Sequence, residues 1–387
     1  MVAERVSRSS RRFVLTGAAL FVAWRAADLL GAGRSTAVAL GLYGFLFLTL
    51  FGKAYALVPA YFDRTLALPD APRVQWPLSV TGTVLLAAGY PAVGAAAWTA
   101  GVAVFLAALL WTVRDNPLGR ETGTGEANAD RRRVDRAANA AVPVALAYLA
   151  AGSYDLLAAA AGLPTLVAAP ARTHLLAAGT VALLVFAVGF RLLPRFLVGH
   201  PPRALVAVVL PAGALGPALI AAGFGGGPLF HAGAALEAAA VIGFAAAVVL
   251  LVVRSDRRRV ARYALLAAAA SGTAGVALGL WFAVSGPTGG LIAAHYRLNL
   301  LGFLGLTVVG AAYQFYPPGV GTHRGVDDRT ALGSIVALAA GLLVAAVGSV
   351  VSPPLVVVGD AVTLAGAVAY AGLLAALFVE RHGRQAV

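Results

Sequence analysis

The chain has 387 residues, of which 60% are hydrophobic and 12% charged, and its formal net charge is +13. Long uncharged apolar stretches suit helices that cross a bilayer, so this composition excludes an ordinary soluble domain. The absence of cysteine excludes disulfides, iron–sulfur clusters and thiolate metal sites. Excess arginine in a membrane protein marks cytoplasmic loops, so no nucleic-acid partner is expected.

Twelve apolar stretches predict an all-α, polytopic membrane protein of about 12 transmembrane helices, forming one transmembrane domain over residues 1–387. The first stretch lacks a convincing cleavage site, so we interpret it as the first helix and not as a removed signal. The predicted spans are 13–31, 35–58, 77–92, 94–113, 139–161, 173–194, 203–223, 232–253, 261–284, 291–316, 331–351 and 355–379.

Arginines cluster before the first span and in every second connection after it, whereas the opposite connections are nearly uncharged. This positive-inside pattern predicts a multi-pass protein of the cell membrane with both termini cytoplasmic. The hydrophilic loop 114–138 then lies on the cytoplasmic side, and the lipid bilayer is the expected partner. The clustered residues are Arg5, Arg8, Arg11, Arg12, Arg131, Arg132, Arg133, Arg136, Arg191, Arg195, Arg203, Arg254, Arg257, Arg258, Arg259 and Arg262, with Arg381 and Arg384 after the twelfth span.

An internal repeat links the second, sixth and tenth spans. Residues 44–59 read GFLFLTLFGKAYALVP and residues 302–317 read GFLGLTVVGAAYQFYP, with nine identities and no gap. Residues 179–194 (GTVALLVFAVGFRLLP) keep the glycine-to-proline step. Chance similarity among glycine-rich helices is the alternative, but the regular placement four spans apart argues against it. The repeat predicts a threefold pseudo-symmetric bundle of four-helix units, roughly 13–113, 139–253 and 261–379.

Two histidines lie inside the repeat frame, near the predicted outer ends of the sixth and tenth spans. His174 precedes its repeat glycine by five residues and His295 precedes its own by seven. A two-residue offset turns a helix by about 200°, so on adjacent units of a threefold ring the two histidine rings could face one shared pore. They would then converge on a single metal or cofactor. The alternative is that each ring is bonded to a backbone carbonyl at a helix end.

At these residues the sequence resembles subunit I of the heme–copper oxidase superfamily, including the cbb-type oxidases and nitric oxide reductases, and the related NnrS family. The stretch from His295 to Pro318 is similar to the family's tenth helix. The stretch from His174 to Pro194, with Arg191 and a following Gly-His at 199–200, is similar to the sixth. The resemblance implies a twelve-helix threefold bundle. It also implies that His295 is the axial ligand of a heme iron and His174 a ligand of an adjacent copper.

The chain departs from that family's pattern at several ligands. Arg297 stands where the second histidine of a His-x-His pair is expected, and the second span has no histidine. The seventh span lacks the His-His copper pair and a tyrosine for the family's cross-link. A low-spin heme is therefore not expected, a second metal is doubtful, and a complete oxygen- or nitric-oxide-reducing centre cannot be assembled as in the family.

Polar residues within the spans have two interpretations. Arg25, Asp28, Asp155 and Glu237 suit structural ion pairs and helix-end hydrogen bonds. Alternatively, Arg25 or Arg297 binds heme propionates, for which the guanidinium fork is well shaped.

The leading hypothesis is a heme-binding membrane protein with one heme, whose cofactor-binding residues are His295, His174, Arg297 and Arg25. It would handle or sense a diatomic gas such as nitric oxide or oxygen, or transfer electrons with a membrane partner. If it is an enzyme, it is an oxidoreductase. The alternative is a cofactor-free transporter or channel on the same scaffold. A third hypothesis is a structural or assembly partner of another membrane complex.

Overall fold

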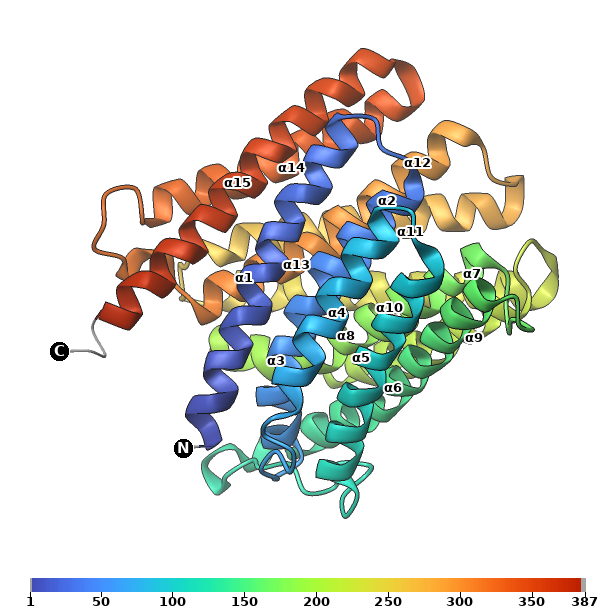
Figure 1. The fold of residues 1–387 in the computed structure, drawn as a ribbon. Helices are drawn as coiled ribbons and strands as arrows, with labels where there is room; N and C mark the ends of the chain where they lie inside the picture. The colour runs from blue at the N-terminus through green and yellow to red at the C-terminus, as the bar shows by residue number, and fades with distance from the viewer. Residues whose placement is uncertain (1, 384–387) are drawn as a thin grey trace.

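The computed structural model describes residues 2–383, and within that range all regular secondary structure is helical. Long helices run up and down the bundle and are joined mostly by short connections (Figure 1). In chain order they are α1 (Val2–Leu29), the continuous helix α2–η1–α3 (Arg34–Val38, Ala39–Leu46, Phe47–Tyr61), α4 (Ala71–Ala87), α5 (Pro91–Val113), α6 (Arg132–Ala161), the continuous helix α7–η3–α8 (Ala169–His174, Leu175–Ala182, Leu183–Phe196), α9 (Arg203–Ala222), α10 (Gly227–Arg254), α11 (Ala261–Ser285), the continuous helix α12–η4–α13 (Gly289–Arg297, Leu298–Gly305, Leu306–Phe315), α14 (Asp328–Val351) and α15 (Pro353–Gly383). Two short 3₁₀ turns, η2 (Glu126–Arg131) and η5 (Pro318–Val320), lie in connections.

The helices identify an integral membrane protein. Within residues 2–383, ten of them are long and apolar enough to cross a bilayer. The two others are α4, which has 17 residues where a bilayer crossing takes about 20, and α1, which carries Arg25 and Asp28 in its apolar half. The number of crossings is therefore ten to twelve, in the order that the sequence predicts.

Several observed helix ends differ from the predicted spans, among them the start of α4 at Ala71 instead of 77. The break between the third and fourth spans falls at residues 88–90 and not at 93, because Gly89 adopts φ 84° and Pro91 opens α5. α6 begins at Arg132, and α1 at Val2, well before the apolar stretches at 139 and 13. Polar residues therefore extend both helices beyond the apolar stretch, and the loop predicted over 114–138 ends at residue 131.

Three eight-residue π-helical segments mark the three repeat segments. η1 begins five residues before Gly44, whereas η3 and η4 each begin four residues before Gly179 and Gly302. π-Helix is rare and usually limited to a single turn. Its recurrence at nearly the same position in all three segments supports the internal repeat.

A close glycine crossing also recurs three times, between the two helices that follow each π-containing helix. In each crossing, a Cβ on the second glycine would come within 3.2 Å of the carbonyl oxygen of the first, so only glycine allows the backbones to approach this closely. The glycine pairs are Gly82 and Gly94, Gly216 and Gly233, and Gly341 and Gly359.

The helices fall into three consecutive groups, α1–α5, α6–α10 and α11–α15. Neighbouring groups meet through α5 and α6 and through α10 and α11. The ring of groups closes where α15 packs on α1, so the red last helix lies beside the blue first helix (Figure 1). The π-helical segments meet inside this ring, η4 touching both η1 and η3. Each group thus shares one interface with each of the other two.

Candidate functional site

The structure brings His174 and His295 together where the second and third groups meet. Their ring centroids lie 6.5 Å apart and the ring planes differ by 26°. His174 ends α7 and His295 lies in α12, each just before the π-helical segment of its own group. Both side chains are partly buried.

Each imidazole is anchored through the same ring nitrogen. His174 Nδ1 lies 3.0 Å from the Pro170 carbonyl oxygen, and His295 Nδ1 lies 2.8 Å from the Gly275 carbonyl oxygen. A carbonyl only accepts, so each Nδ1 carries the proton and donates it. Each Nε2 then keeps a free lone pair, as in metal-ligating histidines whose other nitrogen is oriented by a backbone carbonyl.

The surroundings of the pair are largely aromatic, with one polar neighbour, Asn299, whose Nδ2 lies 3.3 Å from His295 Nδ1. The ring of Phe224 is centred 5.6 Å from that of His174, and the ring of Phe282 is 5.4 Å from that of His295. Gly279 of α11 faces His295, because a Cβ there would lie 3.3 Å from the imidazole Cε1. At position 279, α11 therefore presents no side chain to the imidazole, whereas Phe282 of the same helix packs beside it.

The donor set suits heme better than a bare metal ion. Among the described residues, no three His, Asp or Glu side chains are grouped closely enough to hold a metal. Structural and catalytic zinc sites use three or four protein ligands, which this pair does not provide. Heme supplies four equatorial nitrogens of its own, so one or two histidines are sufficient. The second metal that the family resemblance implies lacks ligands here.

Arg25 and Arg297 lie together in a different interface, between the third and first groups. Both bind Asp360 of α15: Arg25 Nη2 and Arg297 Nη1 each lie 2.5 Å from its Oδ1, and Arg297 Nη2 lies 3.0 Å from its Oδ2. Arg25 also binds Asp28 at 2.5 Å and the Thr363 hydroxyl at 3.0 Å. The guanidinium groups of Arg25 and Arg297 thus bind protein carboxylates and not heme propionates in this structure. This agrees with the interpretation of Arg25 as part of a structural ion pair.

Asp360 is the residue of this network that sequence reasoning missed. It is 1% exposed, and the only acidic residue in the predicted span 355–379. Because a lone carboxylate in a long apolar stretch needs a buried cation, its presence was a usable signal.

A second buried ion pair lies between α6 and α7. Arg172 Nη1 is 3.1 Å from Asp155 Oδ2, and Asp155 Oδ1 accepts hydrogen bonds from the backbone of Leu166 and Val167 at 2.7 and 3.1 Å. Tyr43 of η1 interacts electrostatically with Arg172, which places this pair against the first group.

The arginines and histidines exchange places between the second and third repeats. Seven residues before the repeat glycine, the second repeat has Arg172 and the third has His295; five residues before it, the order is His174 and Arg297. The exchange turns both histidines to one shared interface and each arginine to a different one. The short strings Arg-Thr-His and His-Tyr-Arg carried this signal in the sequence.

Glu237 is a buried carboxylate without a partner. Its side chain is 8% exposed, and its Oε1 has no hydrogen-bond partner within residues 2–383. It lies on α10 against Gly216 of α9, where a Cβ would come 2.8 Å from Oε1.

Arg191 and His200, the other parts of the family resemblance, lie near the opposite end of the helix. Arg191 is seventeen residues from His174, a helical distance of about 25 Å. It binds the Tyr61 and Thr122 carbonyls at 2.9 and 2.7 Å, and His200 binds Asp130 at 2.6 Å. Arg191 therefore orders the connection before α6, and neither residue belongs to the histidine pair.

Comparison with known proteins adds no relative: no family model matches the chain, and no curated protein matches it.

Proposed function

We propose that the protein is a heme-binding integral membrane protein, a reduced relative of heme–copper oxidase subunit I, with its heme between the second and third helix groups. The observation that carries this proposal is the His174–His295 pair. A metal ion held at about 2 Å by two imidazole nitrogens on opposite sides separates the ring centroids by about 6 Å, close to the 6.5 Å found here. With this spacing, His174 and His295 would together hold one iron.

The orientation of the rings gives the second argument. Both Nδ1 atoms are held by carbonyls, so both Nε2 atoms are available as ligands without a tautomer change. When bound, heme would supply an iron that changes oxidation state or binds a diatomic gas. If both histidines hold the iron, electron transfer is the leading activity, and gas handling would instead call for His295 alone to hold it.

The wider architecture that we propose is a threefold pseudo-symmetric bundle in the plasma membrane with both termini cytoplasmic. The three π-helical segments, the three glycine crossings and the closed ring of group contacts support the symmetry. The arginine clusters support the orientation.

An absorption spectrum of the detergent-purified protein, produced with heme available, tests the cofactor. We expect a Soret band, a change on adding dithionite, and little further change with carbon monoxide if both histidines are ligands. His295→Ala should lose most of the heme. His174→Ala should keep part of it and become reactive to carbon monoxide.

His231→Ala is the matched control. His231 lies near the start of α10, is exposed near the same end of the bundle, and binds the Ala283 carbonyl at 2.7 Å, so its loss should leave the spectrum unchanged. The absence of a Soret band in wild-type protein, or full heme retention in both His174→Ala and His295→Ala, would overturn the proposal.

A second candidate function, a cofactor-free transporter or channel, has one observation in its favour. Glu237 is buried with an unpartnered oxygen, and ionisable residues inside a bundle commonly mark substrate or proton paths. This candidate predicts heme-free protein and a proton or cation flux in liposomes that Glu237→Gln abolishes. Arg25, Asp28 and Asp155 no longer support it, since each is in an ion pair.

A further inference from the structure

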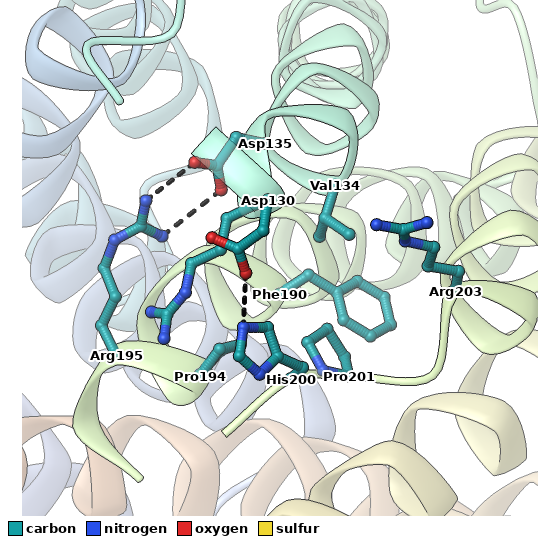
Figure 2. Close-up of a pocket in the computed structure, with 10 residues that line it drawn as sticks. Asp130, Val134, Asp135, Phe190, Pro194, Arg195, His200, Pro201 and Arg203 are labelled. Carbon is teal, nitrogen blue, oxygen red and sulfur yellow. Dashed lines mark hydrogen bonds and ion pairs between the residues drawn. The ribbon is translucent and has the colours of Figure 1, made fainter. Parts of the chain in front are cut away.

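A basic pocket lies at the end of the bundle opposite the histidine pair, where α6 begins, α8 ends and α9 begins. It has a volume of about 170 Å³. Figure 2 shows Arg195, Arg203, His200, Asp130 and Asp135 around it. The sequence places this end at the cytoplasmic surface of the membrane, because the arginine clusters lie here.

The polar lining contains more cations than its carboxylates neutralise. His200 binds Asp130 at 2.6 Å, and Arg195 binds Asp135 at 2.8 Å; these two contacts use both acidic residues (Figure 2). Arg131 and Arg203 also line the pocket. The guanidinium group of neither residue makes a hydrogen bond or an ion pair with any described residue. The Nε of Arg131 is in addition shielded from solvent without a partner.

The remaining wall is apolar. Val134, Phe190, Pro194 and Pro201 complete the lining, and Phe190 is 2% exposed. An apolar wall beside unpaired guanidinium groups, at the ends of membrane-crossing helices, matches a ligand with a charged head and a less polar body. Arginine is the side chain best shaped for phosphate oxygens, and basic pockets between membrane helices on the cytoplasmic side bind anionic headgroups.

We propose that this pocket binds a phosphate group through Arg131 and Arg203, carried either by an anionic phospholipid or by a soluble phosphate compound. The bound anion would neutralise the two arginines and hold the start of α6 to the start of α9. The site lies near the other end of the helix from His174, so it is independent of the proposed heme.

The test uses the full-length protein in a neutral detergent and follows its melting temperature by tryptophan fluorescence. The probes are short-chain phosphatidylglycerol, short-chain phosphatidylcholine and inorganic phosphate at equal concentrations. We expect phosphatidylglycerol to stabilise the protein more than phosphatidylcholine does, and the gain to shrink at high salt. Stabilisation by inorganic phosphate as large as that by phosphatidylglycerol would instead identify a soluble phosphate as the ligand.

Variants separate this pocket from general attraction to the basic surface. Arg131→Gln combined with Arg203→Gln should weaken phosphatidylglycerol binding about 30-fold, since each arginine near an anionic lipid contributes about 1 kcal/mol. Arg133→Gln, an exposed neighbour on α6 that does not line the pocket, should change it little. Equal stabilisation by all three probes, or an unchanged response in the double variant, would refute the proposal.

Discussion

The interface between the third and first groups and the interface between the second and third groups use corresponding positions for different chemistry. In the first of these, Arg297 reaches Asp360, which also binds Arg25. In the other, the position corresponding to Arg297 holds His174, and no carboxylate within residues 2–383 pairs with either histidine. An interface closed by ion pairs has its polar groups already satisfied, whereas the histidine interface keeps two lone pairs for a ligand.

A second comparison shows why the histidine interface has no carboxylate. In the second group Gly179 packs on Tyr148, and Asp155 lies seven residues after Tyr148 on the same helix. In the third group Gly302 packs on Ser271, and Gly279 lies eight residues after Ser271. Asp155 binds Arg172, while Gly279 faces His295. The second group therefore sets an acid against its arginine, whereas the third group sets a glycine, one position beyond the one that aligns with Asp155, against its histidine.

The largest effect is expected from Asp360→Ala. This change leaves Arg25 and Arg297 buried without their shared carboxylate, and breaking a buried ion pair costs about 3–5 kcal/mol. The yield of folded protein and its melting temperature should both fall sharply, whereas exposed Asp256→Ala serves as the matched control. If Asp360→Ala is as stable as Asp256→Ala, the ion network does not hold the ring closed.

A conversion of the histidine interface into an ion-pair interface comes next. Gly279→Asp and His295→Arg should each destabilise the protein, since an unpaired charge within a membrane helix costs about 2.5–3.5 kcal/mol. Together they should recreate the Asp155–Arg172 arrangement and be coupled favourably by at least about 1 kcal/mol. The measurement is a double-mutant cycle on melting temperatures, with Gly279→Asp plus His231→Arg as the uncoupled control. Additive effects would show that positions 279 and 295 do not correspond to 155 and 172.

Asp155→Asn should have a smaller effect than Asp360→Ala. The amide oxygen can still accept from the backbone of Leu166 and Val167, so only the contact with Arg172 loses its charge. A loss of about 1–3 kcal/mol is expected, measured by chemical denaturation in detergent. Asp155→Ala, which removes the backbone contacts too, should be clearly worse; equal effects would mean that charge alone matters.

The smallest effect concerns Asp327, the N-cap of α14 outside the membrane-spanning part. A hydrogen bond from the Thr330 backbone N–H lowers the pKa of this carboxyl below its usual value. A lowered pKa in the folded state adds stability above the unfolded value of about 3.9, and that stability is lost as the pH falls through the folded value. Asp327→Ala should therefore lower the melting temperature slightly at pH 7, and the difference from wild type should shrink as the pH falls below the unfolded value and vanish once the folded carboxyl is protonated.

Much of the fold could be predicted from the sequence because apolar length alone marks a membrane helix. The helix order, the repeat segments and the glycine-to-proline step were all visible. Helix ends were harder to predict where polar residues continue a helix, as at Arg132. A stretch of apolar residues marks the part of a helix inside the bilayer, but it does not show how far the helical hydrogen bonds continue beyond it. The π-helical segments could not be predicted, since their widened turns depend on packing inside the ring.

The candidate site was less predictable than the fold. The meeting of His174 and His295 followed from their two-residue offset, which periodicity records. The shared partner of Arg25 and Arg297 could not be predicted, because Asp360 lies 335 residues from Arg25 and no local sequence pattern connects them. Whether Glu237 has a partner was equally hidden, since it depends on the residues packed around α10.

The contact between α1 and α15 has a consequence for how the protein is made. Arg25 enters the membrane with the first helix, while Asp360 is synthesised 335 residues later. Among the described residues, Arg25 binds two acids, Asp28 and Asp360. Until Asp360 is made, Asp28, one turn away on the same helix, is the acid of these two that is present. The nascent chain must therefore keep its first helix in place, by this local pair or with the help of the insertion machinery, until the last helix arrives. Truncation before residue 360 should release α1 for degradation even though every residue of that helix is present.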